Sequence, residues 1–319
     1  MLDPTTGYSR GTINSGCVRN RGYELEITAT PVLTRDFRWN TTLTWSKNDN
    51  KILSLAEGAD ENQVISTVGT ASIIGRVGGT TGDLWGYKLV RDPEGNVIIG
   101  DNGLPEQADE IEYVGTAYAD WKAGWYNEFS YKGFKLGILL DGQVGGTIYS
   151  MSFHKMMEQG KLTQSLNGRL PGTEYYMDAN DPRIAAAGYT PQSGMYMIAP
   201  GVVRNDDGTF SPNTKVVTIE SFYKEYYRRA NVETNSFDAS FLKIREIRLE
   251  YELPKKVLEK SPFSKASIAV YGRNLWCFTD YPLFDPESVA LDGSSMVSGI
   301  ETGSLPTTRT FGFNLNLTF

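Results

Sequence analysis

Strict alternation of apolar and polar side chains, over stretches of about ten residues, limits the possible folds of this sequence more than any other feature. The segment 310–319, TFGFNLNLTF, shows it most clearly. Its apolar residues occupy every second position: Phe311, Phe313, Leu315, Leu317 and Phe319. A period of two places alternate side chains on opposite faces of a β-strand. Because any half-buried strand shows this period, the pattern predicts a strand but leaves its surroundings open.

The same alternation recurs in six further segments, which are 21–32, 36–47, 123–131, 134–144, 241–253 and 266–276. Each is close to the ~9–11 residues with which a tilted strand crosses a bilayer. The last alternates least regularly. In the segment 241–253, Leu242 and Ile244 are out of phase with Ile247 and Leu249, which predicts a β-bulge near Arg245. The sequence therefore predicts seven strands.

The two faces of these strands differ in chemistry. Aromatic residues lie near strand ends, as in the girdles of a lipid-facing barrel: Phe37 and Trp45, Trp121 and Tyr131, Phe311 and Phe319. We expect one set of side chains to point outward, with Trp39, Leu43, Ile138 and Leu315 as examples. We expect a second set to point inward, with Asn40, Thr42, Lys135 and Asn314 as examples. These features alone favour a membrane barrel and a soluble β-sandwich equally.

The connections between the strands distinguish these two folds, because short and long ones alternate. The short ones are Leu33–Asp36, Lys132-Gly133 and Pro254–Lys265, and the long ones are Asn48–Asp120, Thr147–Asp238 and Thr279–Leu305. Outer-membrane barrels have short periplasmic turns and long extracellular loops, whereas a sandwich has long loops at both ends. The sequence therefore predicts an all-β fold. We expect an antiparallel transmembrane β-barrel of the outer-membrane type, present as a partial wall of about seven to eight strands with long extracellular loops.

Composition excludes several other classes of protein. The formal net charge is −7, which argues against a nucleic-acid-binding protein. The sequence has one histidine and two cysteines, too few for most zinc sites and catalytic triads. We expect no catalytic residue, cofactor or metal. Cys17 and Cys277 could pair, although free thiols are the simpler expectation. We find no run of the ~18 apolar residues that a membrane-spanning helix needs.

The long connections hold the residues that could contact a ligand. Segment 48–120 contains thirteen acidic and four basic residues, which either bind a cation or sugar hydroxyls or form a solvated acidic surface. We prefer the second interpretation, a solvated acidic surface. Four tyrosines are candidate substrate or lid contacts, although packing between loops is the simpler role for them: Tyr175, Tyr176, Tyr189 and Tyr196. Asp280, Asp285 and Glu287 lie in a proline-containing loop and are not expected to be catalytic. SFYKEYYRRA predicts a short helix, and His154 is expected to be a loop residue without a partner.

Several long blocks of the sequence resemble the C-terminal part of SusC/RagA-type TonB-dependent transporters of Bacteroidetes outer membranes. They include VRNRGYELEITATPV, LWGYKLVRDPEGN, YADWKAGWYNEFSYKGFKLGILLDGQVGG, FLKIREIRLEYELPKKVL, YGRNLWCFTDYPLFDPES and PTTRTFGFNLNLTF. The blocks occur in the same order over nearly the whole chain, and the likeness is weakest in Lys161–Asn213. This resemblance implies import of oligosaccharides or peptides across the outer membrane, driven through TonB. It also implies an integral barrel in contact with outer-membrane lipid and a SusD-like surface lipoprotein that acts as a lid.

The sequence also departs from the family pattern. The family has a plug domain and further strands before this region, so we expect residues 1–319 to be the C-terminal portion of the barrel. TonB would then act only through the missing plug region. We expect this segment alone to form an incomplete curved wall, with open edges near Arg21–Thr30 and at Phe311–Phe319.

Three functions can be compared at this stage. A transporter barrel is favoured by the loop asymmetry and by the terminal aromatic residue Phe319, which with Phe311, Phe313, Leu315 and Leu317 resembles the signal read by the barrel-assembly machinery. A soluble β-rich carbohydrate-binding module is the alternative, and it would be monodisperse without detergent. A hydrolase would need a convincing pair of carboxylates in one pocket, which the sequence does not offer.

Overall fold

One large antiparallel sheet forms the main body of the protein. The computed structural model describes residues 16–287, 290–292 and 295–319. In this part of the chain the sheet has seven strands, in the order β1-β2-β7-β8-β15-β16-β20. Their bounds are β1 Gly16–Leu33, β2 Phe37–Leu55, β7 Trp121–Tyr131, β8 Phe134–Val144, β15 Phe241–Glu252, β16 Lys265–Phe278 and β20 Thr310–Thr318. All seven predicted strands are thus confirmed, and β2 continues further into the first long connection than expected.

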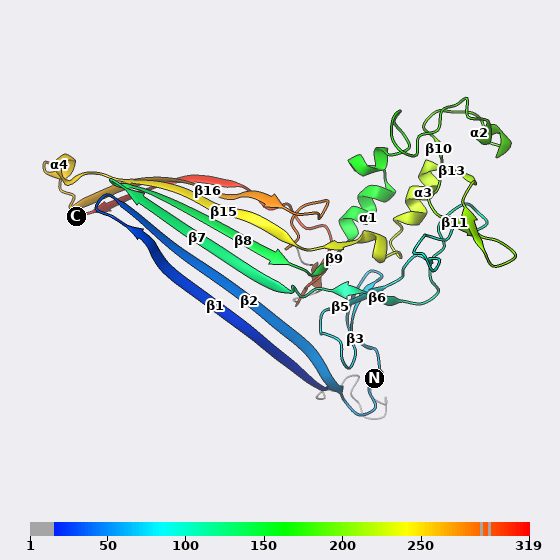
Figure 1. Ribbon diagram of the computed structural model, residues 1–319, viewed down its shortest axis with the longest axis horizontal. Coiled ribbons are helices and arrows are strands. Elements are labelled where there is room, and N and C mark those ends of the chain that lie inside the picture. The colour runs from blue at the N-terminus through cyan, green and yellow to red at the C-terminus, as the bar shows by residue number, and fades with distance from the viewer. Residues whose placement is uncertain (1–15, 288–289, 293–294) are drawn as a thin grey trace, which may run out of the picture.

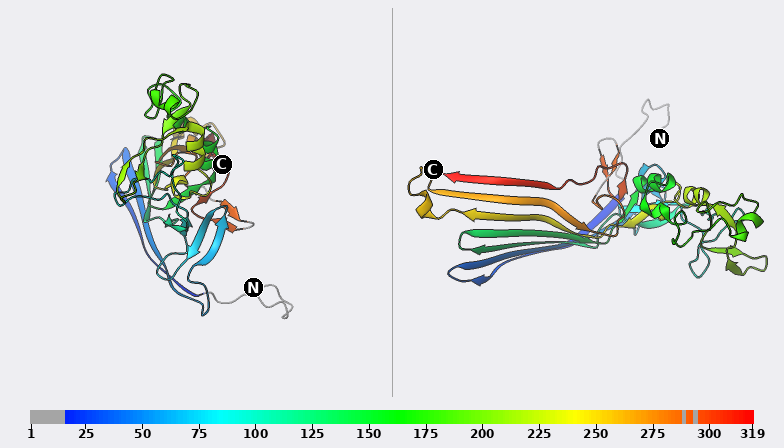
Figure 2. Two further views of the ribbon diagram at one scale, coloured as in Figure 1. Left: turned by 90° about the vertical axis from the view of Figure 1, so that its right-hand side faces the viewer. Right: turned by 90° about the horizontal axis from the view of Figure 1, so that it is seen from above.

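The sheet is an open, curved wall (Figures 1 and 2). Every neighbouring pair of strands in it is antiparallel. Strands β1 and β20 stand at its two ends and are not paired with each other in the described residues. The prediction of an incomplete wall with two open edges is confirmed.

The hydrogen-bonded register of the sheet shifts at three places, one of them between Cys17 and Val18 in β1. The register of β15 shifts between Ile244 and Glu246, which confirms the predicted bulge at Arg245. The third shift lies between Ala29 and Val32 in β1. It contains Pro31, whose ring nitrogen cannot donate a ladder hydrogen bond, so the irregularity lies where the proline requires it.

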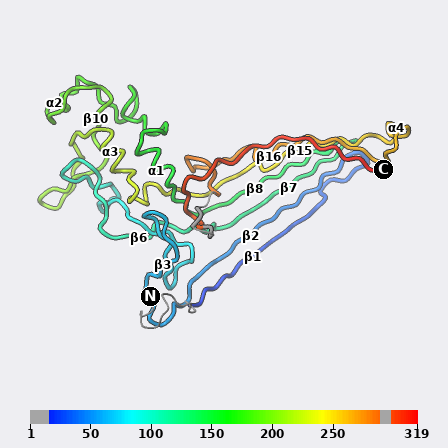
Figure 3. The backbone as a smooth tube through the Cα atoms, turned by 180° about the vertical axis from the view of Figure 1, so that it is seen from behind, coloured from blue at the N-terminus to red at the C-terminus, as the bar shows by residue number. Residues whose placement is uncertain are grey.

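Short turns gather at one end of the wall and long connections at the other (Figures 1 and 3). β7 and β8 are joined by Lys132 and Gly133, with φ of 45° and 88°. Two successive positive φ values give the twist that suits a two-residue hairpin. The third short turn contains helix α4 (Lys255–Leu258), close to the C-terminus in Figure 1. The predicted asymmetry of the connections is confirmed.

The long connections build a head of small sheets and short helices. A four-stranded sheet contains β3 (Gln63–Val68), β4 (Ala71–Gly75), β5 (Asp83–Gly86) and β6 (Glu112–Thr116). The other strands are β9 Thr147–Ser150, β10 Tyr196–Ile198, β11 Val202–Arg204, β12 Phe210–Pro212, β13 Val216–Thr218, β14 Ser236–Asp238, β17 Ala290–Asp292, β18 Ser295–Val297 and β19 Ile300–Glu301. The helices are α1 Met151–Glu158, α2 Pro182–Ala186 and α3 Ile219–Tyr226, with 3-10 turns at Thr163–Leu166 and Glu233–Asn235. Helix α3 confirms the helix predicted in SFYKEYYRRA.

The head has its own hydrophobic core, to which all three long connections contribute. One buried cluster combines Leu84 from the first connection, Tyr149 and Val232 from the second, and Ile300 from the third. A second cluster packs α1 against α3 through Phe153, Met157, Ile219, Phe222 and Tyr223. The three connections therefore pack together as one body beyond the strand ends.

None of the helices in the described part of the chain is long and apolar enough to cross a membrane.

Candidate functional site

The register of the sheet assigns every strand residue to one of two faces. Trp39 pairs with Phe129, which pairs with Leu136, and the row continues through Leu249 and Val270 to Phe313. In the same way Asn40 pairs with Glu128, and Lys135 pairs with Glu250. Tracing these rows puts Trp39, Leu43, Ile138 and Leu315 together on an apolar face, and Asn40, Thr42, Lys135 and Asn314 together on a polar face. The predicted division of these eight residues is confirmed.

The apolar face ends in a row of aromatic rings at the end with short turns. Phe37 pairs with Tyr131, Tyr131 with Phe134, and Phe134 with Tyr251. The rings of Phe134 and Tyr251 are 4.5 Å apart between centroids. Aromatic side chains concentrate at the two interfaces of membrane barrels, where their apolar and polar parts are both accommodated. This row is therefore placed as the girdle of a lipid-facing surface would be.

A polar pair, Thr41 of β2 and Asn127 of β7, interrupts the middle of the apolar face. Asn127 is 5% exposed, and its side-chain oxygen accepts hydrogen bonds from the Trp39 indole and the Thr41 hydroxyl, both at 3.0 Å. The Trp125 indole donates to Thr41 at 2.8 Å. An unsatisfied polar group in hydrocarbon costs several kcal/mol. The two indole rings therefore shield the pair and satisfy it. Sequence alternation missed this cluster because it records only residue polarity.

The polar face carries ionised side chains of both signs. Arg273 of β16 donates to Glu246 of β15 at 2.6 Å, and Arg248 donates to Glu250 at 2.7 Å. A hollow of about 480 Å³ opens on this face and is lined mainly by Glu24, Glu26, Thr44, Ser46, Lys122 and Asp141, together with Gly124. Such a surface remains hydrated, which suits the interior of a barrel that passes water-soluble molecules.

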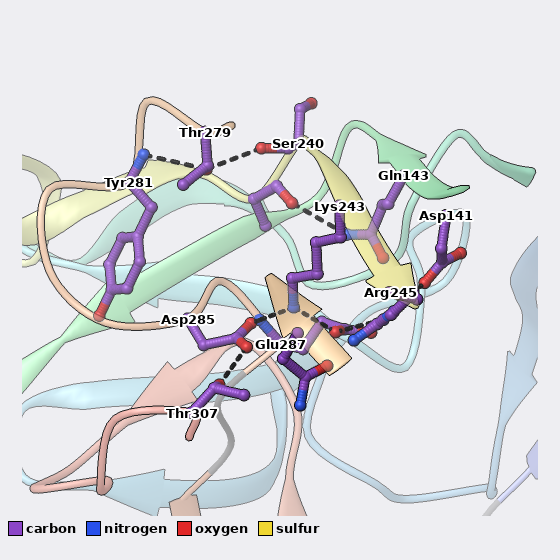
Figure 4. A network of polar contacts seen from close by, with 12 residues as sticks. Asp141, Gln143, Ser240, Lys243, Arg245, Thr279, Tyr281, Asp285, Glu287 and Thr307 are labelled. Atoms are coloured by element: carbon purple, nitrogen blue, oxygen red, sulfur yellow. Dashed lines mark hydrogen bonds and ion pairs between the residues drawn. The ribbon is translucent and has the colours of Figure 1, made fainter. Parts of the chain in front are cut away.

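A network of ion pairs joins the last long connection to the polar face near the head (Figure 4). Lys243 of β15 is 4% exposed and donates to Asp285 at 2.5 Å and also to Glu287. Arg245, the bulge residue, donates to Asp141 at 2.5 Å and to Glu287 at 2.6 Å. Because Lys243 pairs in register with Asp141 on the polar face, segment 283–287 lies over that face.

The charges within this network depend on one another. Burial alone would raise the pKa of Asp285, but hydrogen bonds from Lys243 and Thr307 outweigh it and hold that pKa below its usual value. Removing one partner of a buried ion pair leaves an uncompensated charge, which typically costs about 3–5 kcal/mol. The network therefore anchors the connection between β16 and β20. Asp285 and Glu287 stand out in the sequence as acidic loop residues, but their partner Lys243 lies 42 residues before Asp285, beyond any local pattern.

Glu301 ties the same connection to helix α1. It is 0% exposed and accepts hydrogen bonds from the hydroxyls of Ser150 at 2.6 Å and Ser152 at 2.8 Å. Ser150 caps the helix, and a carboxylate at a helix N-terminus is stabilised by the helix dipole. Glu301 is thus a structural residue of the head.

The four candidate tyrosines do not converge on one site. Tyr189 and Tyr196 lie together in one cluster of the head, with ring centroids 4.8 Å apart, and Tyr196 is 8% exposed. Tyr175 packs against the separate cluster formed by α1 and α3. Tyr176 is half-buried. Their role as substrate or lid contacts stays a prediction.

His154 corrects one expectation, because it lies in helix α1 and has a partner. It is 1% exposed, its Nδ1 lies 2.6 Å from the carbonyl oxygen of Tyr227, and burial lowers its pKa. The histidine was misplaced because its helix contains only one turn of recognisable apolar spacing. Cys17 and Cys277 are free thiols. In the part of the chain that the structure describes, no group of three or more His, Cys, Asp or Glu residues could hold a metal ion.

Similarity to known receptors extends over the whole chain. The chain is 26% identical over 346 aligned positions to TonB-dependent receptor P3 of Formosa agariphila, and the alignment covers 100% of this chain and 30% of that receptor. It is also 26% identical over 151 positions to TonB-dependent receptor SusC of Bacteroides thetaiotaomicron, covering 43% of this chain and 15% of that receptor. The fold matches a solved structure of the RagAB peptide importer with a TM-score of 0.62 and 15% identity, covering 100% of this chain and 31% of that one. The chain is related to the SusC/RagA-type TonB-dependent receptors.

No protein-family model matches the sequence. The chain spans about 30% of the length of the TonB-dependent receptor P3. The antiparallel wall of this SusC/RagA-like segment is therefore a partial barrel.

Proposed function

We propose that this chain is the C-terminal portion of an outer-membrane receptor that imports nutrient molecules with energy relayed by TonB. One observation carries the proposal: a membrane-length antiparallel wall has an apolar face, a charged face and all of its long connections at one end. Similarity to TonB-dependent receptors along the entire chain supports it. The segment contributes no catalytic step.

The parts of the segment have separate roles in this proposal. The apolar face contacts outer-membrane lipid, and the polar face lines the passage. The head of long connections lies outside the cell, where a SusD-like lipoprotein would close over it as a lid. TonB acts through regions outside residues 1–319. The cargo is an oligosaccharide or a peptide, the two classes that the resemblance to SusC/RagA-type transporters implies.

We further propose that the last strand carries the assembly signal. In β20 the residues Phe311, Phe313, Leu315 and Leu317 share the apolar face, and Phe319 follows the strand. Phe319 is 85% exposed, and its ring touches only the ring of Phe263 among the described aromatic residues. An exposed ring beside an unpaired edge is accessible to an assembly factor.

A growth experiment tests the proposed import. A strain lacking the receptor is grown on a panel of single glycans and protein hydrolysates as sole carbon source, with and without the gene on a plasmid. We expect growth to fail on at least one nutrient, to return with the plasmid, and to fail again when TonB is removed. Unchanged growth of the deletion strain on every nutrient would contradict the proposal.

Cell fractionation tests the alternative of a soluble carbohydrate-binding module. We expect the receptor in the outer-membrane fraction and its release only by detergent, because its apolar face extends over all seven strands of the described sheet. Recovery of monodisperse protein in buffer alone would favour the soluble module.

A further inference from the structure

Helices α1 and α3 lie in the head, beyond the end of the strand wall (Figure 1). Residues of both helices line a hollow of about 850 Å³. We refer to it as the α1–α3 pocket. Its lining comes from α1, from α3 and from the segments between them: Lys155, Glu158, Gln159, Lys161, Arg169, Gly194, Met195, Thr218, Ile219, Glu220 and Lys224. Its volume is within the range of small-molecule sites, roughly 300–1,000 Å³.

Positive charge is concentrated in this pocket. Residues 151–226 contain seven Lys or Arg and eight Asp or Glu, whereas the pocket lining has four of the cations and two of the acids. Lys155 pairs with Glu158 at 2.9 Å, and Lys224 pairs with Glu220 at 2.5 Å. These contacts hold the pKa of both carboxyl groups below its usual value, so the two pairs are neutral overall.

Lys161 and Arg169 remain as the unpaired cations of the lining. Neither makes an ion pair with any residue in the described part of the chain, and Arg169 is half-buried. The Arg169 side chain makes no hydrogen bond within the described residues, although its charge lies near enough to the Glu220 carboxylate to help lower the pKa of that group. Its N–H donors are therefore available to a bound anion. Its planar group of five N–H donors matches the two oxygens of a carboxylate or sulfate.

Two glycines pack closely against Arg169. Gly160 and Gly194 have φ of 67° and 68°, which favours glycine at both places. A Cβ added to Gly160 would lie 2.7 Å from a guanidinium nitrogen of Arg169, and one added to Gly194 would lie 2.4 Å from its carbonyl oxygen. Arg169 therefore packs its backbone closely against Gly194 and its guanidinium group closely against Gly160.

We propose that the α1–α3 pocket binds an oxyanion, a carboxylate or sulfate, carried by the cargo molecule. Arg169 holds the anion in a two-pronged contact and Lys161 adds a second charge. Gln159 offers a polar group to the rest of the ligand, and Met195 and Ile219 supply the apolar part of the lining. The role in cargo capture rests on the proposed import function, whereas the anion site itself rests on the pocket alone.

Calorimetry on the receptor purified in detergent tests this site. The probes are trigalacturonate and triglutamate as acidic oligomers, maltotriose as a neutral one, and inorganic sulfate as a free anion. We expect at least one acidic oligomer to bind and Arg169→Gln to weaken it roughly tenfold, the usual effect of losing a hydrogen bond to a charged group. Lys161→Gln should weaken it severalfold. Added salt should weaken binding by the wild type more than binding by the double variant, which carries both substitutions.

Arg204→Gln is the matched control, because it removes the same charge from an exposed position of β11 outside the pocket. We expect it to bind like the wild type. The inference is overturned if neither acidic oligomer binds, or if the double variant binds as tightly as the wild type while melting at the same temperature. Binding of sulfate alone would overturn the assignment to cargo.

These outcomes are separable from those of the growth experiment. Loss of import with intact, Arg169-dependent binding would reject the proposed function and leave the anion site standing. Import of a nutrient with no Arg169-dependent binding would reject the anion site alone.

Discussion

At the scale of single residues, position along the strand decides which environment a side chain meets. Ile138 and Leu139 are adjacent and chemically alike, yet they lie on opposite faces. Ile138 pairs with Asn127 and Ile247 in the middle of the apolar face, whereas Leu139 pairs with Tyr126 and Glu246 on the polar face. This pair of neighbours therefore separates the effect of environment from that of residue type.

We expect Ile138→Arg to reduce the free energy of unfolding by about 2–4 kcal/mol, the usual effect of arginine at the bilayer midplane of a barrel. Leu139→Arg should cost much less, because its guanidinium would meet water and Glu246. The measurement is urea-induced unfolding of the receptor in lipid vesicles. Equal losses for the two variants would show that the faces are not lipid and lumen.

The side-chain pattern could predict these faces because alternation is a local property of the chain. It could not predict the hydrogen bonds of Asn127, whose partner Trp39 lies 88 residues away. The same limit applies to Arg169 and Lys161, which nothing in the sequence distinguishes from other surface cations. Their significance comes from their place in the lining of the α1–α3 pocket and from the lack of an ion pair to either of them within the described residues, which only the packed head shows.

At the scale of elements, the wall and the head differ in how far the sequence determines them. A strand of 9–19 residues shows its period several times over, so all seven strands and the bulge at Arg245 were predictable. Strands β10 to β14 have three residues each, too short for any period to show. Their existence depends on contacts such as Ile198 with Val216, so apart from helix α3 the head could only be predicted as long connections.

The last strand provides a prediction at this scale. Deleting Phe319 removes a ring that contacts Phe263, with centroids 5.0 Å apart, and leaves the register of β20 with β16 intact. We expect less receptor in the outer membrane, measured by surface labelling, and normal ligand binding by the molecules that do assemble. If Phe319 merely packs at an edge, the deletion would lower thermal stability while surface levels stay the same.

Phe263→Ala is the control for that deletion, because it removes the same ring contact and leaves the last residue in place. A defect confined to the Phe319 deletion would separate recognition by the assembly machinery from local packing.

At the scale of the whole molecule, the two free edges of the wall decide what residues 1–319 can do alone. Strands β1 and β20 each have one neighbour in the described sheet. An edge of ~10 residues leaves about five N–H and five C=O groups unpaired. In hydrocarbon each such group costs several kcal/mol, so roughly twenty groups cost tens of kcal/mol. That exceeds the ~5–15 kcal/mol by which folded proteins are stable.

We therefore expect that residues 1–319, fused to an export signal, form no working barrel by themselves. Closure of the seven strands on themselves is unfavourable as well, because single-chain bacterial barrels have even strand numbers of about eight or more. The measurement is a search for a heat-modifiable, protease-resistant band in outer membranes, with the whole receptor as the positive control. Such a band, together with channel conductance in planar bilayers, would show that the seven strands complete a barrel without further strands, and that the edges of β1 and β20 meet in the membrane.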